Sequence, residues 1–401
     1  MSEAPTPPAE PPEAGLPTVS GIVYERVGGA LVPLAATVLA FLIGGLVVLI
    51  TGHNPLTAYR AIFNGTGFNW FFPWVSGDER VTAARDLQET LRVATPMILT
   101  ALAVAFAFKA GLFNIGGQGQ YWIGFISALV VGTQIHGLPR PLHVLLGIGA
   151  GILGGMFWGG IAGFLRATSG AHEVITTIML NWIAIFGGQY LFELGGHLQG
   201  SNPSLPRSDV IDDSAKLWVF WGHFPGLHVG IFIAVAALVV YSLILNRTTL
   251  GFGLRAVGFN PEAARYSGIP VRRSYFLALA IAGGFAGLAG AIDVLGFKYS
   301  VDTSDFGSGV AFTGIAVALL GRNKPVGIFF AGLLFAGLQV GTSSRHLDPE
   351  IFEPALASDL STMIQALFIF FVGADVLIIY IWRLRRYLKL RPTPREEPAR
   401  L

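Results

Sequence analysis

The chain has 401 residues, of which 53% are hydrophobic and 12% are charged. A soluble chain carries about 25% charged residues, so this composition excludes a soluble protein and predicts an integral membrane protein. The formal net charge of +2 indicates little, but the lack of cysteine excludes disulfides, thiolate metal sites and cysteine nucleophiles. The apolar runs are continuous rather than alternating, which argues against a β-barrel.

The two ends of the chain differ in composition from the rest. Residues 1–22 are rich in proline and contain no Lys or Arg. We expect a disordered cytoplasmic arm there and no secretory signal peptide, which would need a basic start. Residues 23–388 form one predicted polytopic transmembrane domain, and residues 389–401 a basic cytoplasmic tail of the kind that binds anionic lipid.

Apolar stretches near the length needed to cross a bilayer recur between these ends. The predicted spans are residues 27–50, 93–108, 120–135, 142–165, 174–194, 229–245, 275–295, 309–320, 326–340 and 360–382. We therefore expect an all-α membrane protein of about ten transmembrane helices. The spans beginning at residues 93, 120, 309 and 326 are short, which is typical of broken helices that line a pathway.

A short internal repeat supports two related halves. Both copies read GxGxxxxGxxxAL. The first copy has Gly117, Gly119, Gly124, Ala128 and Leu129, and the second has Gly307, Gly309, Gly314, Ala318 and Leu319. A chance match between Gly-rich membrane helices is the alternative to a true duplication. Small residues at this spacing let helix backbones approach closely in lipid.

The distribution of positive charge predicts the orientation. Most of the 26 Lys and Arg fall on one side when the amino terminus is placed inside. The positive-inside rule then puts both termini in the cytoplasm. Two sizeable loops, residues 51–92 and 195–228, are expected outside.

The largest inside loop, residues 246–274, carries strong helix signals. Asn260 is a capping residue, Pro261 suits the first helical position and Glu262 faces the helix dipole. Gly268, followed by Pro270, ends the same helix. Such a helix of about two turns is too short to be stable alone and needs a surface to pack on.

Nucleotide-binding motifs are absent from the sequence. The GFGLRAVG stretch within this loop lacks the GxGxxG spacing, and no lysine follows a glycine, so a P-loop cannot be formed. We expect that the chain is not an enzyme, has no catalytic residues and does not hydrolyse ATP itself.

Three segments together carry a family resemblance. They are the inside loop, residues 94–120 (ATPMILTALAVAFAFKAGLFNIGGQGQ) and residues 314–327 (GIAVALLGRNKPVG). With them, roughly residues 93–383 resemble the permease subunit of bacterial ABC importers for nucleosides. That subunit belongs to a broader class that also moves ribose and branched-chain amino acids.

The resemblance implies a multi-pass protein of the bacterial inner membrane with several partners. These are a cytoplasmic ABC ATPase that uses ATP and Mg, a second permease that is a distinct paralogue or else another copy of this chain, and an extracytoplasmic substrate-binding protein. It also implies that the inside loop couples to the ATPase. Glu262, Arg265 and Tyr266 would then face the ATPase, while Ala263, Ala264 and Ile269 seat the helix. The coupling residues are Gly258, Asn260, Pro261, Glu262, Ala263, Ala264, Arg265, Tyr266 and Gly268. A merely topogenic basic loop is the alternative.

A polar, glycine-rich break separates the second and third spans, at residues 109–120. Irregular backbone at membrane depth is tolerated where it is buried in protein or lines a wet cavity. The predicted substrate-pathway residues are Phe113, Asn114, Gln118, Gln120, Trp122, Asn181 and Gln189. A short cytoplasmic turn, or amide clasps between helices, are the alternatives. Aromatic faces and amides suit a nucleoside, although a sugar would also be satisfied.

Other functions are less well supported by the residues. The eight His form no ligand spacing with a carboxylate, so we expect no metal and no cofactor bound by this chain. We expect the lipid bilayer, and no nucleic acid, as the partner of the basic tail. The alternatives to a nucleoside permease are a permease for ribose or another simple sugar and a self-contained secondary transporter.

Overall fold

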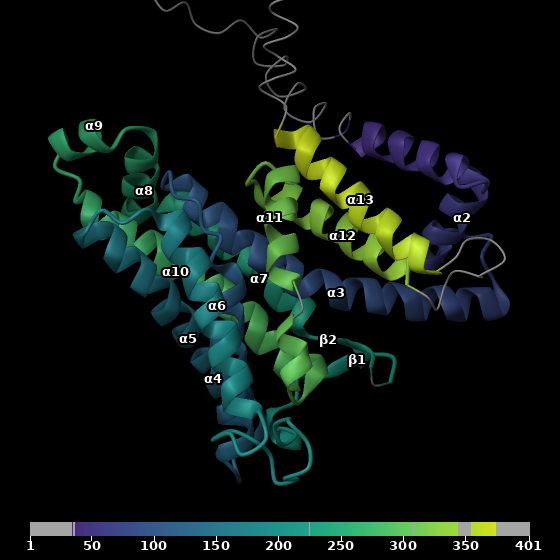
Figure 1. Cartoon of the computed structure of the whole chain (residues 1–401), viewed down its shortest axis with the longest axis horizontal. Coiled ribbons are helices and arrows are strands. Elements are labelled where there is room, and N and C mark those ends of the chain that lie inside the picture. Colours follow the sequence, from purple (N-terminus) through teal and green to yellow (C-terminus); the bar gives the residue numbers. More distant parts are fainter. Residues whose placement is uncertain (1–33, 35–36, 224, 308, 344–353, 374–401) are drawn as a thin grey trace, which may run out of the picture.

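The computed structural model describes residues 34, 37–223, 225–307, 309–343 and 354–373, and these residues are mostly helical (Figure 1). The arm 1–22, the tail 389–401 and parts of the first and last predicted spans lie outside the described residues. The helices are Thr37–Ile50, α2 Pro55–Gly65, α3 Gly77–Lys109, α4 Gly117–Gln134, α5 Arg140–Thr168, α6 Glu173–Phe192, α7 Gly230–Arg247, α8 Thr249–Phe259, α9 Pro261–Tyr266, α10 Val271–Asp293, α11 Val310–Leu320, α12 Pro325–Gly341 and α13 Pro354–Gly373.

Six helical segments in the described part of the chain are long and apolar enough to cross a membrane. They are Gly77–Lys109, Arg140–Thr168, Glu173–Phe192, Gly230–Arg247, Val271–Lys298 and Thr303–Leu320. Three shorter apolar helices are Thr37–Ile50, Pro325–Gly341 and Asp359–Phe371. The chain is therefore a multi-pass, largely helical membrane protein. The larger number of about ten spans stays a prediction.

The centre of the bundle is a glycine contact between α5 and α10. A Cβ placed on Gly155 would come 2.2 Å from the carbonyl oxygen of Gly283, and one on Gly287 would come 2.2 Å from that of Gly151. Only glycine leaves room for backbones this close. In lipid, close packing of this kind replaces the hydrophobic effect as the force that holds helices together.

The bundle has two distinguishable ends. Helices α8 and α9 lie at one end, which we call the coupling end, at the upper left of Figure 1. A short antiparallel hairpin of β1 (Val219–Trp221) and β2 (Leu227–His228) lies at the other, which we call the hairpin end. Helix α7 follows the hairpin and leads directly into α8, so it runs from one end to the other.

The loops expected outside the membrane contain more structure than the sequence indicates. Helix α3 begins at Gly77 rather than near residue 93, with Asp78 and Glu79 in its first turn where they favour a helix start. Residues 51–92 therefore consist largely of α2, the 3₁₀ turn η1 (Phe68–Phe71) and the first part of α3. The second loop holds the 3₁₀ turn η2 (Asp213–Ala215) and the hairpin.

The two copies of the glycine repeat begin α4 and α11, and these helices start beside each other. The backbone N–H of Ala311 donates to Oε1 of Gln118, 3.1 Å away. From there α4 runs to the hairpin end, where Gly132 accepts from the N–H of Asp212. Helix α11 runs to the coupling end, where the carbonyl of Asn323 accepts from Tyr241 of α7. Both helices therefore start between the two ends and run in opposite directions.

Candidate functional site

The break between α3 and α4 is held by its own amide side chains. The side-chain amides of Asn114 and Gln120 pair with each other through hydrogen bonds of 2.9 and 3.1 Å. Oδ1 of Asn114 also accepts from the backbone N–H of Gly116 at 3.0 Å. The segment between Lys109 and Gly117 thus leaves the helical path and re-enters it with its side-chain amide paired.

Asn181 of α6 joins this break to the rest of the bundle. Its Oδ1 accepts from the N–H of Gly119 at 2.8 Å, and its Nδ2 donates to the carbonyl of Ile115 at 2.9 Å. Asn114, Gln118, Gln120 and Asn181 are all buried. We call these four residues the amide network. It connects the starts of α4 and α11 to the middle of α6.

The amide network gathers four of the seven residues predicted to line a substrate pathway. Their hydrogen bonds go to other groups of the protein. This is the amide contact between helices that the sequence allowed as an alternative to a solute pathway. Phe113 is half-buried and packs against Phe108, with ring centroids 5.0 Å apart and the rings tilted by 35°. Gln189 is half-buried about two turns beyond Asn181. Contact of any of these residues with solute stays a prediction.

Trp122, one turn into α4, lies in an aromatic cluster next to the amide network. Its ring is 4.3 Å from that of Phe306, in the 3₁₀ turn η4 (Thr303–Gly307). The ammonium of Lys298, at the end of the π-helical turn η3 (Val294–Lys298), lies 5.3 Å from the Trp122 ring and 3.2 Å from Asp305. Phe306 and Lys298 were not among the predicted site residues. The one sequence signal for this site was a single lysine at the end of an apolar span.

The coupling segment contains two helices joined at one residue. Asn260 ends α8 and caps α9, and its Oδ1 accepts from the N–H groups of Glu262 and Ala263, both at 3.0 Å. Pro261 takes the first position of α9, and Gly268 follows the helix with a φ of 79°. The predicted helix start and stop are confirmed. Helix α8 before it was not foreseen.

The coupling segment is seated on the bundle through α8 and one face of α9. Ala264 is buried against Val257 and Val271, and Ile269 packs partly on this cluster. Gly258 lies against the end of α3, because a Cβ there would come 2.4 Å from the carbonyl oxygen of Lys109. The expectation that Ala263 also seats the helix is wrong. Ala263 is exposed, since it falls on the outer face of this short helix.

The outer face of the coupling segment carries exposed aromatic side chains. Phe259 is 91% exposed and Tyr266 is 92% exposed. Glu262 and Arg265, both exposed, face each other at 3.7 Å. Large apolar side chains this exposed are typical anchors of a protein interface. Phe259 was missed in the sequence because it follows the glycine-rich stretch and precedes the recognised cap.

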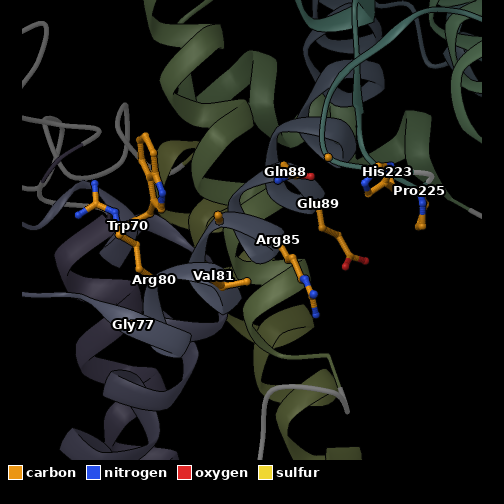
Figure 2. Close-up of a pocket in the computed structure, with 11 residues that line it drawn as sticks. Trp70, Gly77, Arg80, Val81, Arg85, Gln88, Glu89, His223 and Pro225 are labelled. Atoms are coloured by element: carbon orange, nitrogen blue, oxygen red, sulfur yellow. The ribbon is translucent and has the colours of Figure 1, made fainter.

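A cavity of about 710 Å³ opens at the hairpin end, between the first part of α3 and the hairpin loop (Figure 2). Arg80, which lies over the ring of Trp70 with its guanidinium 5.4 Å from the centroid, forms one wall. Arg85 and Glu89 come from the same helix, and His223 comes from the hairpin loop. The lining therefore mixes aromatic and charged groups. Among the described residues, no group of three His, Asp or Glu is placed to hold a metal ion.

The structure is thus a membrane-spanning helical bundle with a buried polar break and an exposed two-helix segment at one end. Comparison with known proteins gives the family. Residues 87–373 match the family described as branched-chain amino acid transport system / permease component. The chain belongs to this family.

Relatives of known name align along nearly their whole length. The chain is 36% identical to the guanosine ABC transporter permease protein NupP of Bacillus subtilis, over 90% of this chain and 97% of that one. It is 36% identical to the nucleoside ABC transporter permease protein NupB of Lactococcus lactis, over 87% and 92%. A glucose ABC transporter permease protein of Haloferax volcanii is 34% identical, over 85% and 86%.

Proposed function

We propose that the chain is the transmembrane permease subunit of an ATP-binding cassette importer that carries nucleosides into a bacterial cell. The observation that carries this proposal is the end-to-end similarity to two nucleoside permeases, at 36% identity each. The membrane-spanning helices and the exposed coupling segment support it, because an importer of this kind needs a path through lipid and a contact for its motor.

The proposed topology has about ten spans with both termini in the cytoplasm. The coupling segment then faces the cytoplasm, where α8 and α9 dock on an ABC ATPase. Phe259 and Tyr266 supply apolar anchors for that contact, and Glu262 and Arg265 supply charge. ATP and Mg belong to the ATPase, and this chain supplies no catalytic group and no cofactor site.

The hairpin end then faces outward. A substrate-binding protein would deliver solute there, near the cavity that contains Arg85 and His223. A second permease, distinct from this one, would complete the pathway. The amide network and Trp122 would lie along it, since broken helices that start at mid-membrane are typical of solute paths.

A simple sugar is the second candidate substrate. The glucose permease of Haloferax volcanii is nearly as similar as the nucleoside permeases, and a nucleoside itself contains a sugar. A self-contained secondary transporter is disfavoured, because the relatives that align along nearly their whole length are named ABC transporter permeases.

Uptake by whole cells tests the proposal. The gene is deleted, and the initial uptake rates of labelled guanosine, ribose and glucose are compared in the deleted strain and in the strain complemented with the wild-type gene. We expect guanosine uptake to be lost on deletion and restored on complementation. Loss of sugar uptake with unchanged guanosine uptake would support the second candidate instead.

A further inference from the structure

Trp122 has a hydrogen-bond donor that the fold leaves unused. The side chain is fully buried, and its Nε1 has no hydrogen-bond partner among the described residues. Buried N–H groups of tryptophan almost always find an acceptor, because an unpaired buried donor is costly. In contrast, Trp158 nearby donates to the carbonyl of Leu180 at 3.2 Å. Within the described part of the chain, the indole N–H of Trp122 is thus a buried donor that is available to a bound acceptor.

An aromatic ring already occupies the space beside Trp122. The ring of Phe306 lies 4.3 Å from that of Trp122 at an angle of 34°, and 6.1 Å from that of Phe192 at 26°. Gly188 of α6 forms the floor, because a Cβ there would come 2.1 Å from Phe306. We call the space between Trp122, Phe192 and Gly188 the aromatic slot. Its geometry accommodates one flat ring between two others.

The occupant of the slot is held by a small element rather than by a long helix. Phe306 belongs to η4, a single turn between η3 and α11. Asp305 in this turn pairs with Lys298 at 3.2 Å and accepts from the N–H of Asp302 at 2.9 Å. The Cα of Gly307, the last residue of the turn, faces open space. Moving η4 requires breaking the ion pair to Lys298 and the hydrogen bond from the N–H of Thr303 to the carbonyl of Pro206, and withdrawing one ring, with α4 and α6 left in place.

We propose that the aromatic slot is the nucleobase-binding site of the permease, and that Phe306 fills it until a base displaces the ring. This inference rests on the proposed function. The base takes the position of Phe306, stacked on Trp122, and Nε1 of Trp122 donates to a carbonyl oxygen or ring nitrogen of the base. Stacking on aromatic side chains suits any base, because every base has a π face. A pyranose sugar has no π face and packs on an aromatic ring only through its C–H groups, so we expect the slot to favour nucleosides over glucose.

Direct binding to the full-length permease in lipid nanodiscs tests the slot. Equilibrium dialysis with labelled guanosine is run on the wild type, Phe306→Ala, Phe306→Leu and the double variant Phe306→Ala/Trp122→Phe. Labelled glucose is run in parallel. Phe330→Ala is the matched control, because Phe330 is an exposed phenylalanine of α12 outside the slot. Thermal stability and size-exclusion profiles show which variants fold.

Removal of the Phe306 side chain is expected to tighten guanosine binding by about tenfold or more, because the site no longer has to be vacated first. If Phe306 had only a structural role, removal of its side chain would weaken guanosine binding or leave it unchanged. Adding Trp122→Phe should weaken binding again by about fivefold to tenfold, the usual effect of one lost hydrogen bond. Glucose binding and the Phe330→Ala control should not change.

Three results would overturn the slot. In the first, folded Phe306→Ala or Phe306→Leu binds guanosine no more tightly than the wild type does. In the second, adding Trp122→Phe does not weaken guanosine binding. In the third, glucose binding tightens as much as guanosine binding. Whole-cell uptake by the wild type separates this failure from failure of the function. Guanosine uptake without tighter binding rejects only the slot, whereas uptake of glucose alone rejects the nucleoside function and the slot with it.

Discussion

Gly119 donates its backbone N–H to Oδ1 of Asn181, 2.8 Å away. This contact joins the first turn of α4 to the middle of α6, between residues far apart in the chain. Nδ2 of the Asn181 side chain donates to the carbonyl of Ile115 at 2.9 Å. One buried side chain therefore holds both the irregular segment before α4 and the helix start itself, and the position of the whole break depends on it.

Replacing Asn181 with Leu should destabilise the protein markedly. The substitution keeps the branched shape of the side chain but leaves a buried N–H and a buried carbonyl unpaired, at about 1–3 kcal/mol for each group. Thermal unfolding in detergent should show a lower midpoint for Asn181→Leu. Asn246→Leu is the control, because the Asn246 amide is exposed and donates to Ser242, one turn away on the same helix. Equal midpoints for the two variants would contradict the role assigned to Asn181.

Two glycines of α5 should respond oppositely to alanine. Gly155→Ala puts a methyl group 2.2 Å from the carbonyl oxygen of Gly283, so α5 and α10 must separate. We expect a loss of several kcal/mol or failure to accumulate in the membrane, because overpacking of a tight contact forces the backbone to move. Gly149→Ala meets no atom within 4 Å and should be neutral or slightly stabilising, since alanine favours helix. Membrane yield and thermal midpoint of both variants check this pair.

The exposed aromatics of the coupling segment should matter for transport and not for folding. Phe259→Ala with Tyr266→Ala removes two side chains that are more than nine-tenths exposed. We expect an unchanged thermal midpoint, but an uptake rate reduced about tenfold or more through loss of interface anchors. Tyr190→Ala, on the exposed face of α6, is the control and should transport normally. A double variant with wild-type uptake would show that the ATPase docks elsewhere.

His228 in the hairpin should make stability depend on pH. Burial, reinforced by the nearby positive charge of Arg92, lowers the pKa of His228 from 6.5 to about 4. The neutral ring accepts from the N–H of Gly230 at 3.1 Å. Between pH 6.5 and 4 the unfolded chain binds a proton at this position that the folded chain does not. Stability is therefore present above pH 6.5 and is lost as the pH falls through this window.

The expected loss from His228 is about 2 kcal/mol between pH 7.5 and pH 5. Thermal midpoints of the wild type and His228→Asn at both pH values measure it. Asparagine retains an acceptor but does not titrate in this range, so its midpoint should change less with pH. His223→Asn, at an exposed position of the same hairpin, should behave as the wild type does. An identical pH response in His228→Asn would assign the effect to other groups.

Local signals in the sequence predict local structure well. The cap at Asn260, the proline after it and the stop at Gly268 define α9 as observed, because each acts on the backbone within a few residues. The same holds for the break before α4, whose glycines and amides stand together in the chain. Helix α3 extends further than its apolar stretch because its first turns are charged and amphipathic, and hydropathy does not detect such turns.

Contacts between distant residues were not predictable from spacing. Nothing in the sequence pairs Trp122 with Phe306 or Lys298, since only the folded path of α10, η3 and η4 brings them together. Polar residues in predicted spans were recognised as unusual, but whether an amide clasps another helix or faces a solute depends on its neighbours in space. The amide network is such a case, with its bonds satisfied across three helices.

The most direct test of the account is competition for guanosine uptake in the deletion strain complemented with the wild-type gene. Labelled guanosine is supplied with a large excess of unlabelled guanosine or of unlabelled glucose. Unlabelled guanosine is expected to suppress the labelled uptake, and glucose is expected to leave it unchanged. If complementation restores no guanosine uptake, or if glucose suppresses it as strongly as guanosine does, the permease is not a nucleoside permease.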